Sequence, residues 1–263
     1  MQTQAEKAER FAALHEGDPF VIPNPWDAGS ARVLAALGFQ ALATTSSGLA
    51  FTLGRRDGGV TLDEVVEHVR AIDGATDLPV SVDLENGYGA DAEDAAPAIE
   101  RAAEAGAVGG SIEDYDPAGH LYEPERAAER VAAAVEAARA LPFRFMLTAR
   151  AENHIRGNPD LADTIGRLQA YERTGADVLY APGLRSVDEI RAVCEAVSLP
   201  VNVLAVPDLS LAEILGAGAR RVSVGGSLTW VAVEAMADAA VAIRDHGDLS
   251  ALAARVPLEE WFG

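Results

Sequence analysis

Short apolar runs alternate along this chain with longer amphipathic segments that are rich in alanine. The apolar runs predict eight strands, at 21–24, 41–45, 80–84, 109–113, 143–150, 178–180, 201–204 and 221–224. The amphipathic segments predict helices at 28–37, 62–72, 92–105, 124–140, 161–173, 187–197, 209–215 and 228–244. This alternation is typical of right-handed βαβ units built around a parallel sheet.

The junctions between helices and strands form a weak internal repeat. Four strands follow a helix that ends in glycine, as in LGFQALATT and TGADVLYAP, and three follow a Leu-Pro step, as in LPVSVDLE. About eight such units favour a (β/α)8 TIM barrel over an open doubly wound sheet, which usually carries a glycine-rich phosphate turn. We therefore predict one barrel domain over residues 1–263, with an N-terminal helix at about 3–15 and C-terminal helices at about 228–255.

Composition narrows the possible partners and the cellular compartment. Hydrophobic residues make up 49% of the 263 residues, and the formal net charge is −20. Such an acidic surface repels nucleic acids and anionic membranes, so neither is expected as a partner. The N-terminal stretch MQTQAEKAERFAALH lacks the apolar core of a signal peptide, and no apolar run of about 18 residues occurs. These features predict a cytoplasmic protein, and the single Cys194 is interpreted as a buried apolar residue.

Polar residues gather where the predicted strands end. Asp83 and Glu85 close the stretch PVSVDLENGYG, Glu113 ends the fourth strand in SIEDYD, and Arg150 ends the fifth in LTAR. The active site of an α/β barrel lies at the carboxyl ends of its strands. We therefore expect these side chains to face one small volume at the barrel mouth.

The three carboxylates Asp83, Glu85 and Glu113 predict a metal site. Carboxylates held this close repel one another unless a proton or a cation lies between them. Oxygen ligands suit Mg²⁺, with Mn²⁺ as an alternative ion, and no His-rich or Cys-rich spacing indicates zinc. The alternative is a set of salt bridges from these acids to arginines such as Arg55, Arg56 and Arg150.

Other groups at the strand ends indicate an anionic substrate. The guanidinium of Arg150 suits a carboxylate, and the turn at 46–49 offers hydroxyl and main-chain N–H groups. Trp26, after the first strand, and Asn202, on the seventh, are further candidates for substrate binding. Together with a cation, these groups predict a small 2-oxo acid that binds through two oxygens.

Four segments resemble the isocitrate lyase/phosphoenolpyruvate mutase superfamily: TTSSGLAFTLGRRDGG (44–59), VDLENGYG (82–89), GSIEDYD (110–116) and TARAEN (148–153). The resemblance extends over about residues 21–244. It implies an (α/β)8 barrel, commonly a tetramer with an exchanged C-terminal helix. It also implies Mg²⁺-dependent making or breaking of a C–C or P–C bond next to a 2-oxo acid.

The resemblance also implies roles for individual residues. Asp83 resembles the direct metal ligand, and Glu85 and Glu113 resemble the acids that hold the ion through water. Asp57 resembles the acid of the gating loop, and Ser47, Gly48 and Leu49 resemble the turn that binds the substrate carboxylate. Arg150 resembles the arginine that neutralises the substrate and its enolate.

Two departures leave the reaction open. The loop DYDPAGHLYEPER (114–126) lacks the cysteine and lysine of the lyases, and Pro182 stands where the lyases carry a glutamate. His120 is the leading candidate for the proton donor and Tyr122 the second, although a plain exposed loop histidine is an equal interpretation of His120. The favoured function is a lyase or decarboxylase of a small 2-oxo or 2-hydroxy di- or tricarboxylate, in a dimer or tetramer. The alternatives are phosphonopyruvate hydrolase or phosphoenolpyruvate mutase activity, and a non-catalytic 2-oxo acid binder.

Overall fold

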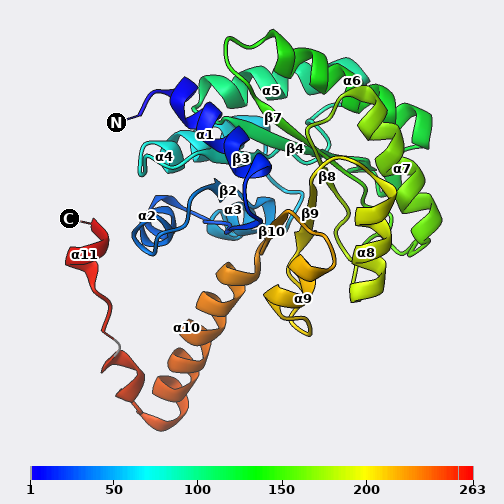
Figure 1. Ribbon diagram of the computed structural model, residues 1–263. Coiled ribbons are helices and arrows are strands. Elements are labelled where there is room, and N and C mark those ends of the chain that lie inside the picture. Colours follow the sequence, from blue (N-terminus) through cyan, green and yellow to red (C-terminus); the bar gives the residue numbers. More distant parts are fainter. Residues whose placement is uncertain (1, 254, 263) are drawn as a thin grey trace.

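The computed structural model describes residues 2–253 and 255–262, and its centre is a nearly closed barrel of eight parallel strands (Figure 1). The strands are β1 (Phe20–Ile22), β2 (Leu42–Ala43), β3 (Val80–Asp83), β4 (Gly109–Glu113), β7 (Met146–Arg150), β8 (Val178–Tyr180), β9 (Val201–Leu204) and β10 (Arg221–Ser223). Their order around the barrel is β1-β10-β9-β8-β7-β4-β3-β2. The N–H of Ala43 donates to the carbonyl of Pro23 at 3.0 Å and so joins the two ends of the sheet. The predicted TIM barrel is confirmed, and each predicted strand overlaps an observed one.

Helices surround the barrel and connect its strands. They are α1 (Gln4–Glu16), α2 (Ala28–Ala36), α3 (Ser46–Thr52), α4 (Leu62–Asp73), α5 (Ala95–Glu104), α6 (Pro124–Ala140), α7 (Leu161–Thr174), α8 (Val187–Ala196), α9 (Leu211–Gly216), α10 (Ser227–His246) and α11 (Leu258–Phe262). Two 3₁₀ helices, η1 (Ala92–Asp94) and η2 (Ser250–Ala253), accompany them. Thr61, Ser186 and Ser210 each begin a helix with a capping box, which satisfies main-chain N–H groups that otherwise lack partners.

Helix α1 covers the amino-terminal end of the barrel, opposite the predicted site. Phe11 is fully buried there in a cluster with Phe20, Val108 and Met146. A Cβ on Gly109 would lie 2.6 Å from the ring of Phe11, so only glycine allows β4 to approach the helix this closely. The carboxyl ends of the strands therefore remain the open end of the barrel.

Two elements at the barrel mouth are absent from the sequence-based expectations. The turn at 46–49 forms the first part of the short helix α3, whose N-cap is Thr45. The loop after β4 contains an antiparallel ribbon of β5 (Tyr115–Asp116) and β6 (His120–Leu121). SSGLAFT directly follows a predicted strand without a separate amphipathic segment, and YD and HL contain no apolar run that would predict strands.

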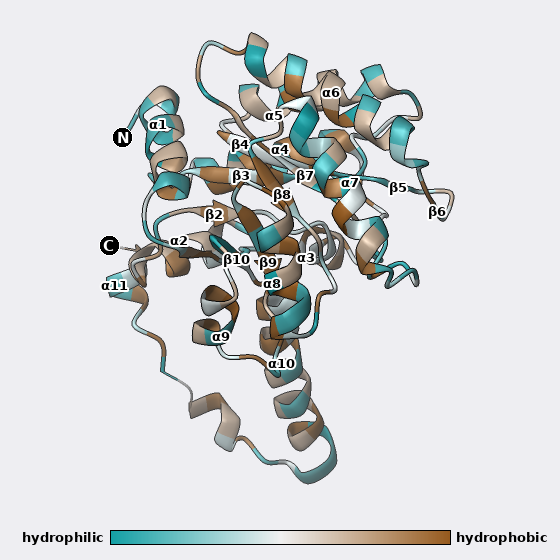
Figure 2. Ribbon diagram, turned by 45° about the vertical axis from the view of Figure 1, so that its right-hand side comes forward, coloured by the Kyte–Doolittle hydropathy of each residue, from teal (hydrophilic) through white to brown (hydrophobic). Residues whose placement is uncertain are grey.

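Helix α10 leaves the barrel, and the chain then turns back so that α11 contacts α2 (Figure 1). Hydrophobic residues recur along α10 outside the barrel (Figure 2), and Trp230, Val231, Met236 and Val241 are exposed. Phe262 of α11 lies under the guanidinium of Arg32, 5.6 Å from Cζ to the ring centre. Within the described part of the chain, no helix combines the length and apolar character needed to cross a membrane.

Candidate active site

Arg150, at the end of β7, connects three acidic side chains at the barrel mouth. Its Nη1 lies 3.3 Å from Oδ1 of Asp83, its Nη2 contacts Oε2 of Glu113, and its Nε lies 2.8 Å from Oε1 of Glu152. These residues come from β3, β4 and the turn after β7, which are adjacent in the sheet. The convergence expected from the strand ends is therefore present, with the guanidinium at its centre.

Main-chain and hydroxyl groups hold Asp83 in this position. Its own N–H donates to Oγ1 of Thr44 at 2.9 Å, which ties the end of β3 to β2. Its carboxylate accepts hydrogen bonds from the N–H of Ser46 at 3.3 Å and of Glu85 at 3.2 Å. The start of α3 therefore contacts the acid directly, because β2 and β3 are neighbours.

Glu85 is held in a backbone conformation that non-glycine residues rarely adopt. Its φ is +46°, and that of Tyr88 in the same turn is +60°. The hydroxyl of Tyr88 donates to Oε1 of Glu85 at 3.2 Å. Burial, together with the negative charges of Asp83 and Asp57, raises the pKa of Glu85 to about 7. Left-handed strain and a perturbed carboxyl in one turn indicate a functional site.

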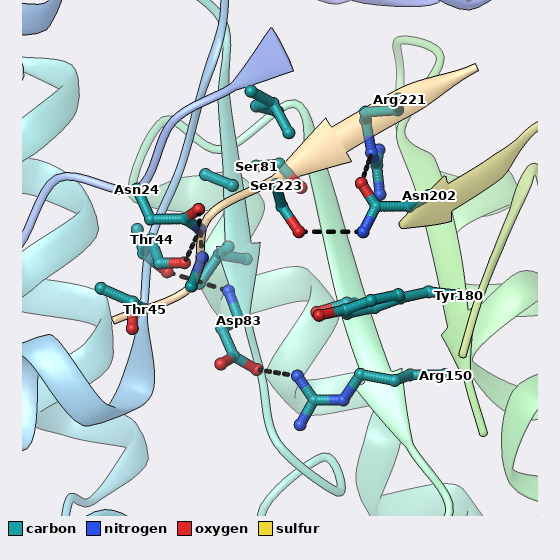
Figure 3. A pocket seen from close by; sticks show the side chains of 15 residues that line it. Asn24, Thr44, Thr45, Ser81, Asp83, Arg150, Tyr180, Asn202, Arg221 and Ser223 are labelled. Atoms are coloured by element: carbon teal, nitrogen blue, oxygen red, sulfur yellow. Dashed lines mark hydrogen bonds and ion pairs between the residues drawn. The ribbon is translucent and has the colours of Figure 1, made fainter. Parts of the chain in front are cut away.

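A cavity of about 260 Å³ opens above these residues. Its charged lining comes from Asp57, Glu85, Glu113, Arg150 and Arg156. Tyr115 and Pro117, on the β5–β6 ribbon, form part of its wall. A second pocket of about 70 Å³ extends from Asp83 and Arg150 into the barrel, and Figure 3 shows its labelled side chains.

Arg156 and Glu152 are contributors to which the sequence pattern assigned no role. Glu152 is almost completely buried; it accepts a hydrogen bond from Nε of Arg156 at 3.0 Å and forms an ion pair with Arg150. The guanidinium of Arg156 also stacks on the ring of Tyr115, with Cζ 3.9 Å from the ring centre. Glu152 lies within the quoted segment TARAEN, and its i, i+4 spacing to Arg156 was the available signal.

Comparisons with known proteins show the family of this chain. Residues 11–244 match the family model of phosphoenolpyruvate phosphomutase. The chain belongs to the isocitrate lyase/phosphoenolpyruvate mutase superfamily of enzymes. The oxaloacetate decarboxylase of Bradyrhizobium diazoefficiens is 30% identical over 94% of this chain and 88% of that protein. The uncharacterized protein Rv1998c of Mycobacterium tuberculosis is 33% identical over 89% of this chain and 88% of that protein.

Solved structures extend the similarity to the superfamily. A crystal structure from Burkholderia cenocepacia J2315, described as that of a lyase/mutase candidate, has a TM-score of 0.94 and 51% identity. The match covers 98% of this chain and 95% of that one. The 2,3-dimethylmalate lyase, a superfamily member, has a TM-score of 0.86 at 26% identity, covering 99% of this chain and 94% of that one.

The turn at 46–49, after β2, lies beside the mouth cavity of about 260 Å³, which Ser46 lines. Gly48 is buried, and a Cβ there would lie 2.6 Å from Cγ2 of Thr45 and 3.0 Å from Cβ of Trp26. The hydroxyls of Ser47 and Thr45 are 3.1 Å apart, and Leu49 packs into the core. Trp26 is half-buried against the turn and lines neither the mouth cavity nor the interior pocket.

The remaining candidate residues of this superfamily member lie at different depths. Asp57 is exposed at the edge of the mouth cavity, as a gating-loop acid would be. Asn202 is 2% exposed and lines the interior pocket, where its amide donates to Oγ of Ser223 at 3.0 Å. His120 is exposed on β6 and lines neither space, so a role in proton transfer would require the ribbon to move.

The charges at the mouth fit a divalent cation. Five carboxylates, from Asp57, Asp83, Glu85, Glu113 and Glu152, face the two guanidinium groups of Arg150 and Arg156. Among residues 2–253 and 255–262, no three His, Cys, Asp or Glu side chains are gathered into a ready coordination shell. Mg²⁺ needs few direct protein ligands because it keeps several waters. The surplus of acidic oxygens therefore suits a divalent cation, and Asp83, Glu85 and Glu113 are the residues that could hold it.

Proposed function

We propose that this enzyme is a Mg²⁺-dependent lyase or decarboxylase that acts on a small 2-oxo or 2-hydroxy acid with two or three carboxylates. The observation that carries the proposal is the Arg150 guanidinium, which is shared by Asp83, Glu113 and Glu152 at the carboxyl ends of adjacent strands. The similarity to oxaloacetate decarboxylase covers nearly the whole chain and supports the same class. Mn²⁺ is an alternative ion.

The arrangement suits a reaction that forms an enolate. Cleavage of the bond next to the 2-oxo group leaves an electron pair that moves onto the oxygen. Arg150 is 13% exposed in its side chain, so its positive charge acts in a partly dry environment where a developing oxyanion is strongly stabilised. A bound cation would supply Lewis acidity toward the same oxygen. We propose that the start of α3, with Ser47, Gly48 and Leu49, receives the substrate carboxylate.

We also propose that the enzyme is a dimer or tetramer in which α10 packs against a second copy. Four large apolar side chains are exposed along this helix, and only Thr229 within it is buried. Several large apolar side chains exposed along a helix that lies away from the barrel favour a protein interface. The projection of α10 away from the barrel agrees with an exchanged helix (Figure 1).

Pyruvate release from oxaloacetate, methylisocitrate and phosphonopyruvate, with and without Mg²⁺, tests the proposal. We expect Mg²⁺-dependent pyruvate from one of the first two substrates. If pyruvate is released from phosphonopyruvate and from neither of the other two substrates, the protein is a phosphonopyruvate hydrolase. If these compounds bind in the presence of Mg²⁺ but none is converted, the protein is a non-catalytic binder.

Asp83→Ala should abolish both Mg²⁺ binding and turnover while the circular dichroism spectrum stays that of the native protein. Asp188→Ala, which changes an exposed acid on α8, is the matched control and should keep full activity. Full metal-dependent turnover in Asp83→Ala would contradict the metal assignment.

A further inference from the structure

A second arginine, Arg221, is buried inside the barrel beneath the active site. It lies at the start of β10 and is 5% exposed. Its Nε donates to Oδ1 of Asn202 at 2.8 Å, and its Nη2 donates to Oγ1 of Thr148 at 2.9 Å. Its Nη1 lies 3.1 Å from Nε2 of His15 on α1. All three partners are uncharged groups.

The contact with His15 shows that Arg221 is the only cation of this pair. Nδ1 of His15 lies 2.8 Å from the carbonyl of Phe11 and must carry the proton that is donated there. Nε2 is then free to accept from Arg221, which makes the imidazole neutral. Burial and the charge of Arg221 both lower the pKa of His15, to about 3, in agreement with this assignment.

No carboxylate among the described residues forms a salt bridge with Arg221. A buried charge without a counter-ion is costly, because polar neighbours replace only part of its hydration. Among the residues that line the same pocket, the one acid is Asp83, and it is already paired with Arg150. The interior of the barrel therefore contains an excess of positive charge.

The pocket of about 70 Å³ gives this charge access to a ligand. A single water centre needs roughly 10–15 Å³ of such space, so the pocket has room for one small anionic group. Its walls carry the hydroxyls of Ser81, Ser111 and Ser223 in addition to Tyr180 and Asn202. Figure 3 shows Arg221 and Arg150 toward opposite ends of the set of lining side chains, with Asn202 and Tyr180 between them.

We propose that this interior pocket binds a carboxylate group, with Arg221 as its counter-ion and the surrounding hydroxyl and amide groups as further hydrogen-bond donors. The subsite differs from the one at the start of α3 and does not require a metal ion. It therefore stands whether or not the proposed reaction is correct. The same chemistry would also hold a free inorganic anion, and the experiment separates the two.

Thermal unfolding of the wild-type protein in EDTA tests the subsite directly. Formate is added at constant ionic strength against gluconate, which is too large for the pocket. We expect formate to raise Tm saturably, by about 2–4 °C at roughly ten times its Kd. Formate without effect beyond gluconate would overturn the subsite. Chloride that acts as strongly as formate would overturn its assignment to a carboxylate.

Substitutions then locate the effect. Arg221→Met should abolish the response to formate, and its Tm in gluconate should be lower than that of the wild type because Asn202, Thr148 and His15 lose a buried hydrogen-bond donor. Arg221→Lys should restore part of the response. Arg220→Met changes a neighbouring arginine that donates to Gly17 outside the pocket, and it should respond as the wild type does. A full formate response in Arg221→Met would contradict the proposal.

If Arg221→Met does not fold, a crystal structure of the wild-type protein with formate tests the proposal instead. Wild-type crystals grown with formate should show the carboxylate within hydrogen-bond distance of the Arg221 guanidinium. Ordered water alone at that position, at a saturating formate concentration, would overturn the proposal.

Discussion

Arg150 contacts Asp83, Glu113 and Glu152 through three different nitrogens of one planar group. Lysine would keep the charge but could not reach three partners and an oxyanion in fixed directions. We expect Arg150→Lys to lower kcat/KM by about 10²-fold or more, which is typical for loss of a donor to a developing oxyanion. Steady-state kinetics on the active substrate measures this. Arg191→Lys, in an exposed pair with Asp188, should be neutral, and a near-neutral Arg150→Lys would make Arg150 a structural residue.

The turn at 46–49, which is proposed to receive the substrate carboxylate, requires glycine at position 48. A Cβ at Gly48 would overlap Thr45 and press on Trp26 and Thr229. We expect Gly48→Ala to reduce the free energy of unfolding by about 1–3 kcal/mol and to raise KM, because α3 must shift. Urea unfolding and kinetics measure the two effects. Gly166→Ala, in α7 with open space around it, should be neutral or stabilising, and equal behaviour of the two variants would refute the steric argument.

At the scale of elements, the β5–β6 ribbon contributes to the cavity wall through Tyr115 and Pro117, while His120 lies exposed on it. If the ribbon closes over substrate, it excludes water and brings His120 toward the reacting atoms. We expect His120→Gln to lower kcat with little change in Mg²⁺ affinity and to remove one limb of the pH–rate profile.

His246→Gln, at the exposed end of α10, is the control for His120→Gln and should leave the profile intact. An unchanged kcat and profile in His120→Gln would reduce the ribbon to a cover. The reaction would then proceed without a protein acid from this segment, which fits decarboxylation better than retro-aldol cleavage.

At the scale of the whole molecule, two buried histidines make stability depend on pH. Burial lowers the pKa of His68 to about 4 and, together with Arg221, that of His15 to about 3. Between these values and about 6.5, each of these histidines binds more protons in the unfolded chain than in the native protein, so its contribution to stability falls as the pH is lowered. Glu85, whose pKa is raised to about 7, contributes in the opposite direction. Each histidine should lower the free energy of unfolding by about 2 kcal/mol when the pH falls from 7 to 5.

Urea unfolding at pH 7 and pH 5 measures this loss. His68→Leu removes one titrating group and should reduce the difference between the two pH values by about 2 kcal/mol. His246→Gln, which changes an exposed histidine at the end of α10, is the control. An unchanged pH dependence in His68→Leu would show that His68 titrates alike in both states.

The oligomer is a second property of the whole molecule. Val231 and Met236 on α10 are each more than 60% exposed, so a glutamate there does not disturb the core of one chain. We expect Val231→Glu combined with Met236→Glu to lower the mass measured by light scattering, since charge is excluded from an apolar interface. Leu211→Glu, exposed on α9, should leave the mass unchanged. A wild-type monomer at micromolar concentration would contradict the proposal.

The sequence by itself determined the barrel and the charged ends of its strands. Short apolar runs between amphipathic segments locate the strands, and parallel strands place their carboxyl ends on one side, so Asp83, Glu113 and Arg150 had to meet. The pattern did not reveal α3 or the β5–β6 ribbon, because SSGLAFT covers only about two helical turns directly after a strand, and YD and HL contain no apolar run.

Only the tertiary structure decided how the charges are paired. Arg150 lies between the acids that the sequence assigned to a metal, and Glu152 and Arg156 join them through contacts that depend on the turn after β7. Arg221 meets His15 across a separation of 206 residues. Strand tilt and register decide which distant side chains lie at the same depth inside a barrel. Local sequence does not encode that depth, so the contact between Arg221 and His15 could not be predicted from it.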